Sequence, residues 1–390
     1  MMPARAVNSG RWDIVVVGSI NIDMMLRGPR LRGPGESIEG EQFQVSPGGK
    51  GGNQSVAAAR LGGRVALVAN IGADVHGQQL LKILKSEHVD CRFVAKDKIL
   101  NTGVAVIMVD QDGKKQIMTA RGANQHLSVD AINAARSAIE NSKVVLLQME
   151  VPAESVLAAA RMARKAGAKI ILDPSPPTDL PAELIELADI IKPNAQEARA
   201  LTGILPADWY QAQSVAEKLF ERGARTVLVQ AGEEGTLLAW RGGSHRVKKH
   251  VVRSVDMTGA GDAFAAAMGL MLAEGRELVE SAEFAGAASA LATTALGAQA
   301  AMPRRSDTEM LQRKEKERER EKEAAAAAPP STTPEEFPTP RPEAGPPPHV
   351  AEKEPVTTAN VVTVERPEGK STVVVEHKPE AIAIADHVVD

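Results

Sequence analysis

The strongest constraint on the fold is the alternation of short apolar runs with Ala-rich amphipathic segments between residues 11 and 305. The runs resemble strands and occupy residues 14–17, 65–69, 144–147, 170–172, 190–191 and 226–229; helical segments such as 54–61, 155–165 and 214–220 separate most of them. Short apolar strands joined by helices predict an α/β fold with a mainly parallel sheet covered on both faces. In such sheets, ligands bind beyond the carboxyl ends of the strands.

Two segments interrupt this alternation, at about 27–44 and 101–120. In the second segment, an apolar run reaches the turn sequence Asp110–Gly113 and a further apolar run follows, which is typical of a β-hairpin. We therefore expect the two segments to form a small β-sheet lid that projects from the main sheet.

The sequence after residue 305 has a different composition. Lysine, arginine and glutamate alternate over residues 313–323, five alanines follow, and residues 329–348 are rich in proline. This composition predicts a separate region, 306–390, that starts as a solvated helix and continues as largely disordered chain. The Val- and Thr-rich stretches at 356–364 and 372–376 have the composition of strands and could dock on a sheet edge.

Composition excludes several classes of function. A net charge of −4 gives no indication of a nucleic-acid partner. The longest apolar helix expected, 263–273, is much shorter than the roughly 20 residues that span a bilayer, so we expect no membrane segment. Cys91 is the single cysteine, which excludes a disulfide framework and favours a reducing compartment. With no apolar leader in residues 1–11, we expect a cytoplasmic protein, and a short organellar address stays open.

The sequence DMTGAGDAF carries the clearest chemical signal. It places Asp256 and Asp262 around a glycine-rich turn that opens an apolar helix. Because backbone N–H groups are unpaired and the dipole is positive at a helix N-terminus, Gly259, Ala260 and Gly261 suit an anion hole for a phosphoryl group. A carboxylate beside that hole suits a base that accepts the proton of an attacking hydroxyl, so Asp262 is the candidate base. A glycine-capped turn with Asp at a helix cap is the alternative interpretation.

Further polar residues follow the predicted strand ends. Donors and acceptors suited to vicinal hydroxyls occur after the first strand, in a glycine cluster that opens the next helix, and after strand 144–147: Asn21, Asp23, Lys50, Asn53 and Glu150. The alternative interpretation of Asn21 and Asp23 is that they form a turn. Since few aromatic side chains accompany these residues, a small polyol is a better acceptor than a nucleoside. Asn194 and Glu197 follow strand 190–191 at the spacing of a capping box, and plain helix capping explains that spacing equally well.

In this order, the motifs resemble those of the PfkB family, the ribokinase-like carbohydrate kinases. The resemblance spans residues 13–303 and rests on blocks at 18–23, 48–54, 102–105, 122–124, 194–197 and 258–264. It implies a three-layer αβα sandwich with a small β lid, in a kinase domain covering residues 11–305. It also implies transfer of the γ-phosphoryl of ATP to the 5-hydroxyl of D-ribose, and a homodimer formed through the lid sheet.

The resemblance assigns roles to individual residues. The sugar site it implies consists of Asn21, Asp23, Gly49, Lys50, Asn53, Glu150 and the base Asp262. The ATP site it implies consists of Asn194, Glu197, Gln230, Gly232, Gly235, Gly261, Asp262 and Gly286, with Glu197 organising Mg²⁺ through water. Gln230 stands where the family usually has threonine, and Gly286 stands where a polar Asn or His often meets the adenine.

The resemblance also implies a potassium ion beside the anion hole. Asp256 and carbonyl oxygens would hold it, at positions that match Thr258, Ala292, Ala295 and Gly297; a last ligand position is Ala301, where a hydroxyl residue is usual. A large, weakly hydrated cation tolerates variable coordination, so we expect weakened potassium activation.

Three alternatives stay open from the sequence. The first is another sugar kinase of the same family, acting on deoxyribose or a hexose. The second is a nucleoside kinase, which the scarcity of aromatic residues disfavours. The third is a catalytically silent binding protein that uses its tail to recruit partners, which the retained Asp262 and its glycines disfavour.

Overall fold

The computed structural model describes residues 12–177 and 180–327. A nine-stranded sheet forms its centre, in the strand order β13-β12-β11-β10-β9-β8-β1-β4-β5. The strands from β11 to β5 pair in parallel, while β12 and β13 form an antiparallel edge. The strand bounds are β1 (Trp12–Val17), β4 (Val65–Gly72), β5 (Asp90–Asp97), β8 (Ser142–Gln148), β9 (Lys169–Asp173), β10 (Ile190–Ile191), β11 (Thr226–Gln230), β12 (Gly235–Trp240) and β13 (Gly243–Lys248).

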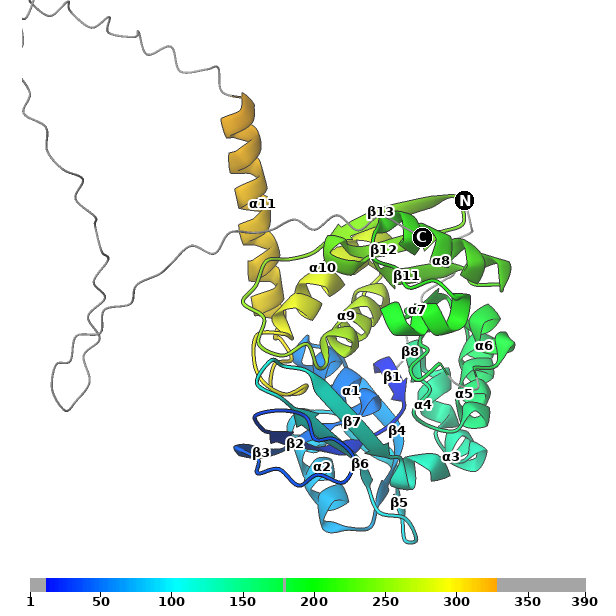
Figure 1. Ribbon diagram of the computed structural model, residues 1–390. Helices are drawn as coiled ribbons and strands as arrows, with labels where there is room; N and C mark the ends of the chain where they lie inside the picture. The colour runs from blue at the N-terminus through cyan, green and yellow to red at the C-terminus, as the bar shows by residue number, and fades with distance from the viewer. Residues whose placement is uncertain (1–11, 178–179, 328–390) are drawn as a thin grey trace, which may run out of the picture. The chain divides into compact units, whose positions relative to one another are not determined.

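Helices cover both faces of this sheet (Figure 1). Successive side chains of a strand point to opposite faces, and β1 shows this directly: Ile14 and Val16 belong to one apolar cluster, while Val15 and Val17 belong to the other. The first cluster includes residues of α1 (Lys50–Arg60), α2 (Val75–Ser86), α9 (Ala260–Ala273) and α10 (Leu278–Leu291). The second includes residues of α3 (Val129–Ala134), α4 (Arg136–Glu140), α5 (Ala153–Ala166), α6 (Ala182–Leu187), α7 (Ala195–Thr202) and α8 (Trp209–Glu221). The predicted three-layer fold is confirmed.

The lid is a separate four-stranded sheet in the order β3-β2-β6-β7. Its strands are β2 (Asn21–Arg27), β3 (Gln42–Gly48), β6 (Gly103–Val109) and β7 (Lys115–Ala120), which lie together at the lower left of Figure 1. The hairpin predicted in the second lid segment forms as expected, through antiparallel pairing of β6 with β7.

The first lid segment differs from its predicted bounds of 27–44. Strand β2 ends at Arg27, where the predicted segment begins, and β3 begins at Gln42, near its end. Residues 28–41 between them form no strand. This stretch contains repeated glycines and prolines, including Gly28, Pro29, Gly33, Pro34 and Gly35. Proline cannot donate to a strand ladder and glycine weakens one, so pairing shifts to the flanking residues.

Helix α11 runs from Arg305 to Ala327, so the charged segment begins as a helix, as predicted. Its first turns pack on the α/β fold: Thr308 is fully buried, and Arg305 pairs with Glu274 at 2.9 Å. Two contacts connect it to the end of β13 and to the segment that follows: Lys248 pairs with Glu319, and His250 Nδ1 forms a hydrogen bond with Glu315. The leader 1–11 and the possible strands at 356–364 and 372–376 lie outside the described residues. Among the helices that the structure does describe, none is long and apolar enough to cross a bilayer.

Candidate active site

Asp262 lies in the first turn of α9 and is almost completely buried. Two amide side chains at the start of α1 donate to its carboxylate: Asn53 Nδ2 to Oδ2 at 3.0 Å and Gln54 Nε2 to Oδ1 at 3.0 Å. Burial raises the pKa of Asp262, while Lys50 nearby opposes the rise. The carboxylate therefore has a fixed orientation and a raised affinity for a proton, as a general base requires.

Lys50 and Asp173 form the charged floor next to this carboxylate. Lys50 Nζ lies 3.1 Å from Asp173 Oδ2, at the carboxyl end of β9, and Gln54 Nε2 donates to the same oxygen at 3.4 Å. The other oxygen, Asp173 Oδ1, is buried and accepts from no group in the described residues. Such an unpaired buried acceptor suits a ligand hydroxyl or an ordered water. Sequence reasoning assigned no role to Asp173 or Gln54. The available signal for Asp173 was a carboxylate directly after the predicted strand 170–172.

The predicted sugar residues gather beside this floor. Asn21 Oδ1 accepts from Asn124 Nδ2 at 2.8 Å, and the Glu150 carboxylate accepts from Ser19 Oγ and from the backbone N of Lys50. Burial raises the pKa of Glu150. The structure thus brings Asn21, Glu150 and Lys50 to one place, and adds Asn124 and Ser19 as residues that orient them.

Asp23 lies on the same strand as Asn21, two residues further along. Burial, followed by repulsion from Glu150 and Asp262, raises the pKa of Asp23 to about 7. A Cβ on Gly48, which faces it across the β2–β3 pair, would lie 2.2 Å from Asp23 Oδ2. Glycine is therefore required at position 48 to leave room for the carboxylate. The neighbouring Gly49 has a φ of 82° and caps α1.

The turn before α9 has the geometry of an anion site. Gly259 is the N-cap with a φ of 86°, and the first hydrogen bond of the helix runs from Ala263 N to Gly259 O at 2.9 Å. The N–H groups of Gly261 and Asp262 precede that bond. A Cβ on Gly261 would lie 3.2 Å from Lys192 Nζ, so a lysine ammonium lies directly beside the turn. Sequence analysis assigned no role to Lys192. The feature that could have identified it is its position as a basic residue directly after strand 190–191.

Asn194 and Glu197 form a complete capping box at the start of α7. Asn194 Oδ1 accepts from Glu197 N at 2.9 Å, and Glu197 Oε2 accepts from Asn194 N at 2.8 Å. The capping interpretation is thus confirmed. The buried Glu197 carboxylate still lies at the carboxyl end of β10, on the same edge of the sheet as Lys192.

The remaining predicted nucleotide residues lie further along the sheet. Gln230 ends β11, and Gly232 and Gly235 flank the short 3-10 helix η2 (Gly232–Glu234), with φ values of 56° and 130°. A Cβ on Gly286, in α10, would lie 2.9 Å from Val247 and 3.3 Å from His250 Nε2. His250 thus occupies the space that a side chain at 286 would fill.

The strand order explains how the two groups of residues relate. The predicted nucleotide residues follow β10 and β11, the predicted sugar residues follow β1 and β8, and β9 with Asp173 lies between them. Since the carboxyl ends of parallel strands meet at one edge, the two half-sites are neighbours on that edge.

Asp256 lies in the loop before the anion turn. It accepts from Thr258 Oγ1 at 2.7 Å, from Gly297 N at 3.1 Å and from Lys115 Nζ at 2.8 Å. Burial alone would raise its pKa, but the hydrogen bonds from Lys115, Thr258 and Gly297 lower the pKa of Asp256 to about 2. Thr258 and Gly297 thus lie beside Asp256, but as hydrogen-bond donors to its carboxylate, whereas the resemblance implies their carbonyl oxygens as ligands of potassium. The backbone N of Asp256 also donates to Thr293 O, the residue after Ala292.

Within the described residues, Ala295 and Ala301 make no hydrogen bond to Asp256, and the methyl side chain of Ala301 is buried. The residue that sequence analysis did not foresee here is Lys115, which reaches Asp256 from the lid.

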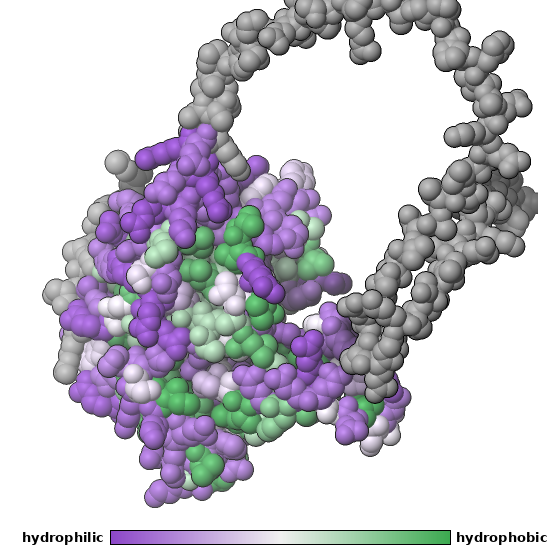
Figure 2. Space-filling view, turned by 90° about the vertical axis from the view of Figure 1, so that its left-hand side faces the viewer, coloured by the Kyte–Doolittle hydropathy of each residue, from purple (hydrophilic) through white to green (hydrophobic). Residues whose placement is uncertain are grey.

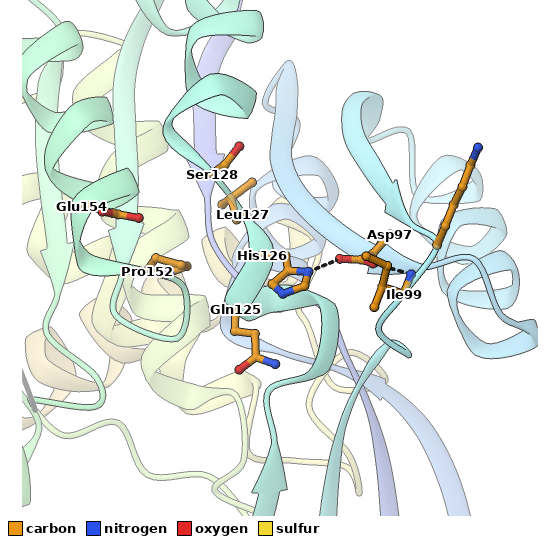
Figure 3. A pocket seen from close by; sticks show the side chains of 9 residues that line it. Asp97, Ile99, Gln125, His126, Leu127, Ser128, Pro152 and Glu154 are labelled. Atoms are coloured by element: carbon orange, nitrogen blue, oxygen red, sulfur yellow. Dashed lines mark hydrogen bonds and ion pairs between the residues drawn. The ribbon is translucent and has the colours of Figure 1, made fainter.

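One cavity, of about 630 Å³, lies between the lid and the loop at 255–257 and is lined by Lys115, Asp256 and Met257 among others. A second cavity, of about 530 Å³, is shown in Figure 3, where His126 points toward Asp97 at 2.7 Å. Asp97 also accepts from the backbone N of Ile99, so its carboxylate serves the local turn. None of the predicted site residues lines the second cavity.

The site combines a buried carboxylate with a glycine-rich helix N-terminus and two lysine ammonium groups, and it lies at the ligand-binding edge of a three-layer α/β sandwich. Such a combination is suited to transferring a phosphoryl group to a hydroxyl. Fold and site thus define a phosphotransferase of the ribokinase-like class.

Comparison with known proteins agrees with this class. Residues 12–305 match the model of the pfkB family carbohydrate kinases. A ribokinase of Haemophilus influenzae is 37% identical over 298 residues, covering 76% of this chain and 97% of the relative. The Arabidopsis thaliana ribokinase solved with ribose and ATP superposes with a TM-score of 0.69 at 32% identity, covering 76% of this chain and 97% of that one. A deoxyribokinase of Salmonella typhi is 30% identical, covering 75% of this chain and 95% of the relative. The chain belongs to the pfkB family of carbohydrate kinases.

The raised pKa of Asp23 predicts a pH-dependent cost to stability. The pKa of Asp23 in the folded protein, about 7, exceeds its ordinary value of 3.8, so the folded state favours the protonated carboxyl. The free energy of unfolding is therefore highest below pH 4, and this stabilisation is lost as the pH rises through 7. We expect Asp23→Asn to raise the free energy of unfolding at pH 8 by about 2 kcal/mol and to leave it unchanged near pH 4. Denaturant unfolding at both pH values measures this. The exposed Asp112→Asn is the control, and equal stability of wild type and Asp23→Asn at pH 8 would contradict the prediction.

Proposed function

We propose that this protein transfers the γ-phosphoryl group of ATP to the 5-hydroxyl of D-ribose, giving D-ribose 5-phosphate and ADP. The observation that carries the proposal is the position of Asp262: its carboxylate is held by Asn53 and Gln54 within the first turn of the helix that forms the anion site. The similarity to ribokinases over most of their length supports ribose as the acceptor.

The sugar half of the site supplies both donors and acceptors. The carboxylates of Asp23 and Glu150 accept from hydroxyl groups, and the amide of Asn53 and the ammonium of Lys50 donate to them. Gly49 lies where a Cβ would meet the backbone of Ile20 and Asn21 at 2.6 to 2.9 Å, so the glycine lets the two segments of the site approach each other. Asp173 Oδ1 adds an acceptor that has no partner in the described residues.

The nucleotide half lies toward β10 and β11. We assign Asn194 and Glu197 to the phosphates and to Mg²⁺, and Gln230, Gly232, Gly235 and Gly286 to the nucleoside. The glycines at 232 and 235 let the chain pass close to the backbone of Ala207 and Val247. The hydrogen bonds from Asn194 fix the orientation of the Glu197 carboxylate, whose remaining lone pairs could accept from the water ligands of Mg²⁺. Mg²⁺ bound to the phosphates would neutralise charge that develops during transfer.

The chemistry follows from the geometry around Asp262. Asp262 orients the attacking hydroxyl and accepts its proton as the oxygen–phosphorus bond forms. The N–H groups of Gly261 and Asp262, together with Lys192, stabilise the negative charge on the transferred group. Ala260 lies in the same turn and has a small side chain that leaves the approach open. Positioning and charge stabilisation dominate because the transition state of phosphoryl transfer is loose.

Potassium is the remaining cofactor implied by the resemblance. The residues present do not fit it as they stand: Asp256 Oδ1 already accepts from the Lys115 ammonium and from Thr258, and Oδ2 accepts from Gly297. We therefore assign potassium no step in the reaction.

Two further parts of the proposal concern assembly and location. On the lid face opposite Asp23, strand pairing brings together apolar side chains that are largely exposed: Leu26, Phe43, Val45 and Met118. In Figure 2, hydrophobic surface interrupts the hydrophilic surface at the height of the lid in Figure 1. A second copy of the chain is the partner we propose for this face. A cytoplasmic location is supported by the single, unpaired cysteine.

Replacing the base tests the chemical assignment. We expect Asp262→Asn to lower kcat for ribose by about 10²- to 10⁴-fold, because the hydroxyl loses its proton acceptor, with little change in ribose and ATP binding. Coupled ADP release and calorimetry measure the two effects. Asp130→Asn, in the first turn of α3, is the matched control. A near-normal kcat of Asp262→Asn would contradict the assignment. Activity measured with deoxyribose, hexoses and nucleosides as acceptors distinguishes ribose from the alternative substrates.

The position of Lys192 predicts a second effect on turnover. Lys192→Met removes a positive charge beside the anion turn, so we expect kcat to fall by about 10²-fold and ribose binding to stay unchanged. Steady-state kinetics and ribose titration measure this. Lys96→Met, on the exposed side of β5, should behave as wild type. Loss of ribose affinity at unchanged kcat would place Lys192 in the sugar site instead.

The proposed dimer can be tested on the outer lid face. Phe43 is 59% exposed there, and we expect Phe43→Glu to convert a dimer into a monomer by placing a charge in the buried interface. Light scattering after size-exclusion chromatography measures the mass. Tyr210→Glu, at an exposed aromatic residue on α8, should stay dimeric. A wild-type protein that is monomeric would contradict the proposal.

A further inference from the structure

Lys115 has no part in the expected chemistry, yet it reaches the loop beside the anion site. It is the first residue of β7 in the lid, and its Nζ lies 2.8 Å from Asp256 Oδ1 and 3.2 Å from Thr258 Oγ1. The Asp256 side chain is 1% exposed, whereas that of Lys115 is 31% exposed. The ammonium therefore caps a buried carboxylate from the solvent side.

We propose that the Lys115 ammonium is a built-in cation that takes the place of a free monovalent cation beside Asp256. The proposal rests on the proposed function, since it concerns the loop that leads into the phosphoryl site. It predicts that this protein works without potassium.

Charge balance supports this assignment. A buried carboxylate is costly unless it is paired with a positive charge. The other donors to Asp256, which are Thr258 and Gly297, are neutral. Among the described residues, Lys115 is the only cationic side chain within 4.0 Å of it. The positive charge that an ion would supply is therefore already provided by the chain.

The coordination chemistry agrees with the charge. A bound potassium ion needs several oxygen ligands, and the methyl side chain at Ala301 provides none. An ammonium needs fewer acceptors, and Asp256 Oδ1 and Thr258 Oγ1 both lie within hydrogen-bond distance of Lys115 Nζ. The residues present suit a tethered ammonium better than a metal ion.

The register of the lid explains why Lys115 can reach this site. Lys115 pairs with Val109, and Val109 pairs with Arg27 of β2. Residues two apart on a strand share a face, so Lys115 lies on the lid face that also carries Asp23. This face borders the cleft of about 630 Å³ that Lys115 and Asp256 both line. The ion pair therefore joins the lid to the loop three residues before Gly259.

The test compares Lys115→Met with Lys114→Met. The neighbouring Lys114 is 71% exposed and pairs with Asp112, so it controls for loss of a lid charge. Ribose kinase activity and Tm are measured for the full chain in about 0.1 M KCl, NaCl or choline chloride, which hold ionic strength constant. Tm gives a readout that does not depend on turnover.

We expect wild type and Lys114→Met to show the same rate and Tm in all three salts. Lys115→Met should lose about tenfold in rate in choline chloride and regain most of it in KCl, with a Tm about 2 °C higher in KCl, because potassium then fills the vacated position. Strong potassium activation of the wild type would overturn the inference. So would a Lys115→Met protein that KCl neither reactivates nor stabilises. Absence of ribose-dependent turnover in every protein and salt would instead reject the proposed function, while the Tm comparison would still decide the role of Lys115.

Discussion

The site depends on the pairing of carboxylates that the fold removes from water. Lys50 is the ammonium that offsets the charge of Asp173, Asp262 and Glu150, and Asp23 lies near Glu150 and Asp262. Burial alone would lower the pKa of Lys50, but the surrounding carboxylates, with Asp173 first, raise it. Asn53 and Gln54, near the start of α1, donate two further hydrogen bonds to Asp262 in α9. These contacts fix the orientation of Asp262 and Asp173 and place a positive charge beside them.

The lid shares its first strand with the substrate site. Asn21 and Asp23 begin β2, and the same strand pairs with β3 and β6 to form the lid sheet. One face of the lid therefore presents polar groups toward the cleft, while the other exposes apolar side chains such as Phe43 and Met118. The contact from Lys115 to Asp256 connects the edge strand β7 of this sheet to the loop before the anion turn. The proposed sugar site, the proposed contact between two copies and the surroundings of the proposed phosphoryl site thus involve the same four strands.

Much of the fold could be predicted because it depends on local pattern. The six apolar runs and the intervening helices follow from periodicity, and the β6–β7 hairpin follows from its turn residues. The bounds of the first lid segment could not be placed, because the strands β2 and β3 form through pairing across a glycine- and proline-rich connection. In the site, residues within recognisable motifs, such as Asp262 and Asn53, were found from sequence. Lys192, Asp173 and Lys115 were missed because each acts through a contact distant in the chain: Lys115 and Asp256 are 141 positions apart.

The sequence by itself determined the layered α/β architecture, the glycine turn at the start of α9 and the capping box at Asn194, since each depends on neighbours within a few residues. Only the tertiary structure decided which charges meet. It placed the Lys192 ammonium beside Gly261 and the Lys115 ammonium on Asp256, and it left His250 in the space beside Gly286. The physical reason is that a charge pair needs two atoms within about 4 Å, and spacing along a chain does not determine that distance for residues on different elements.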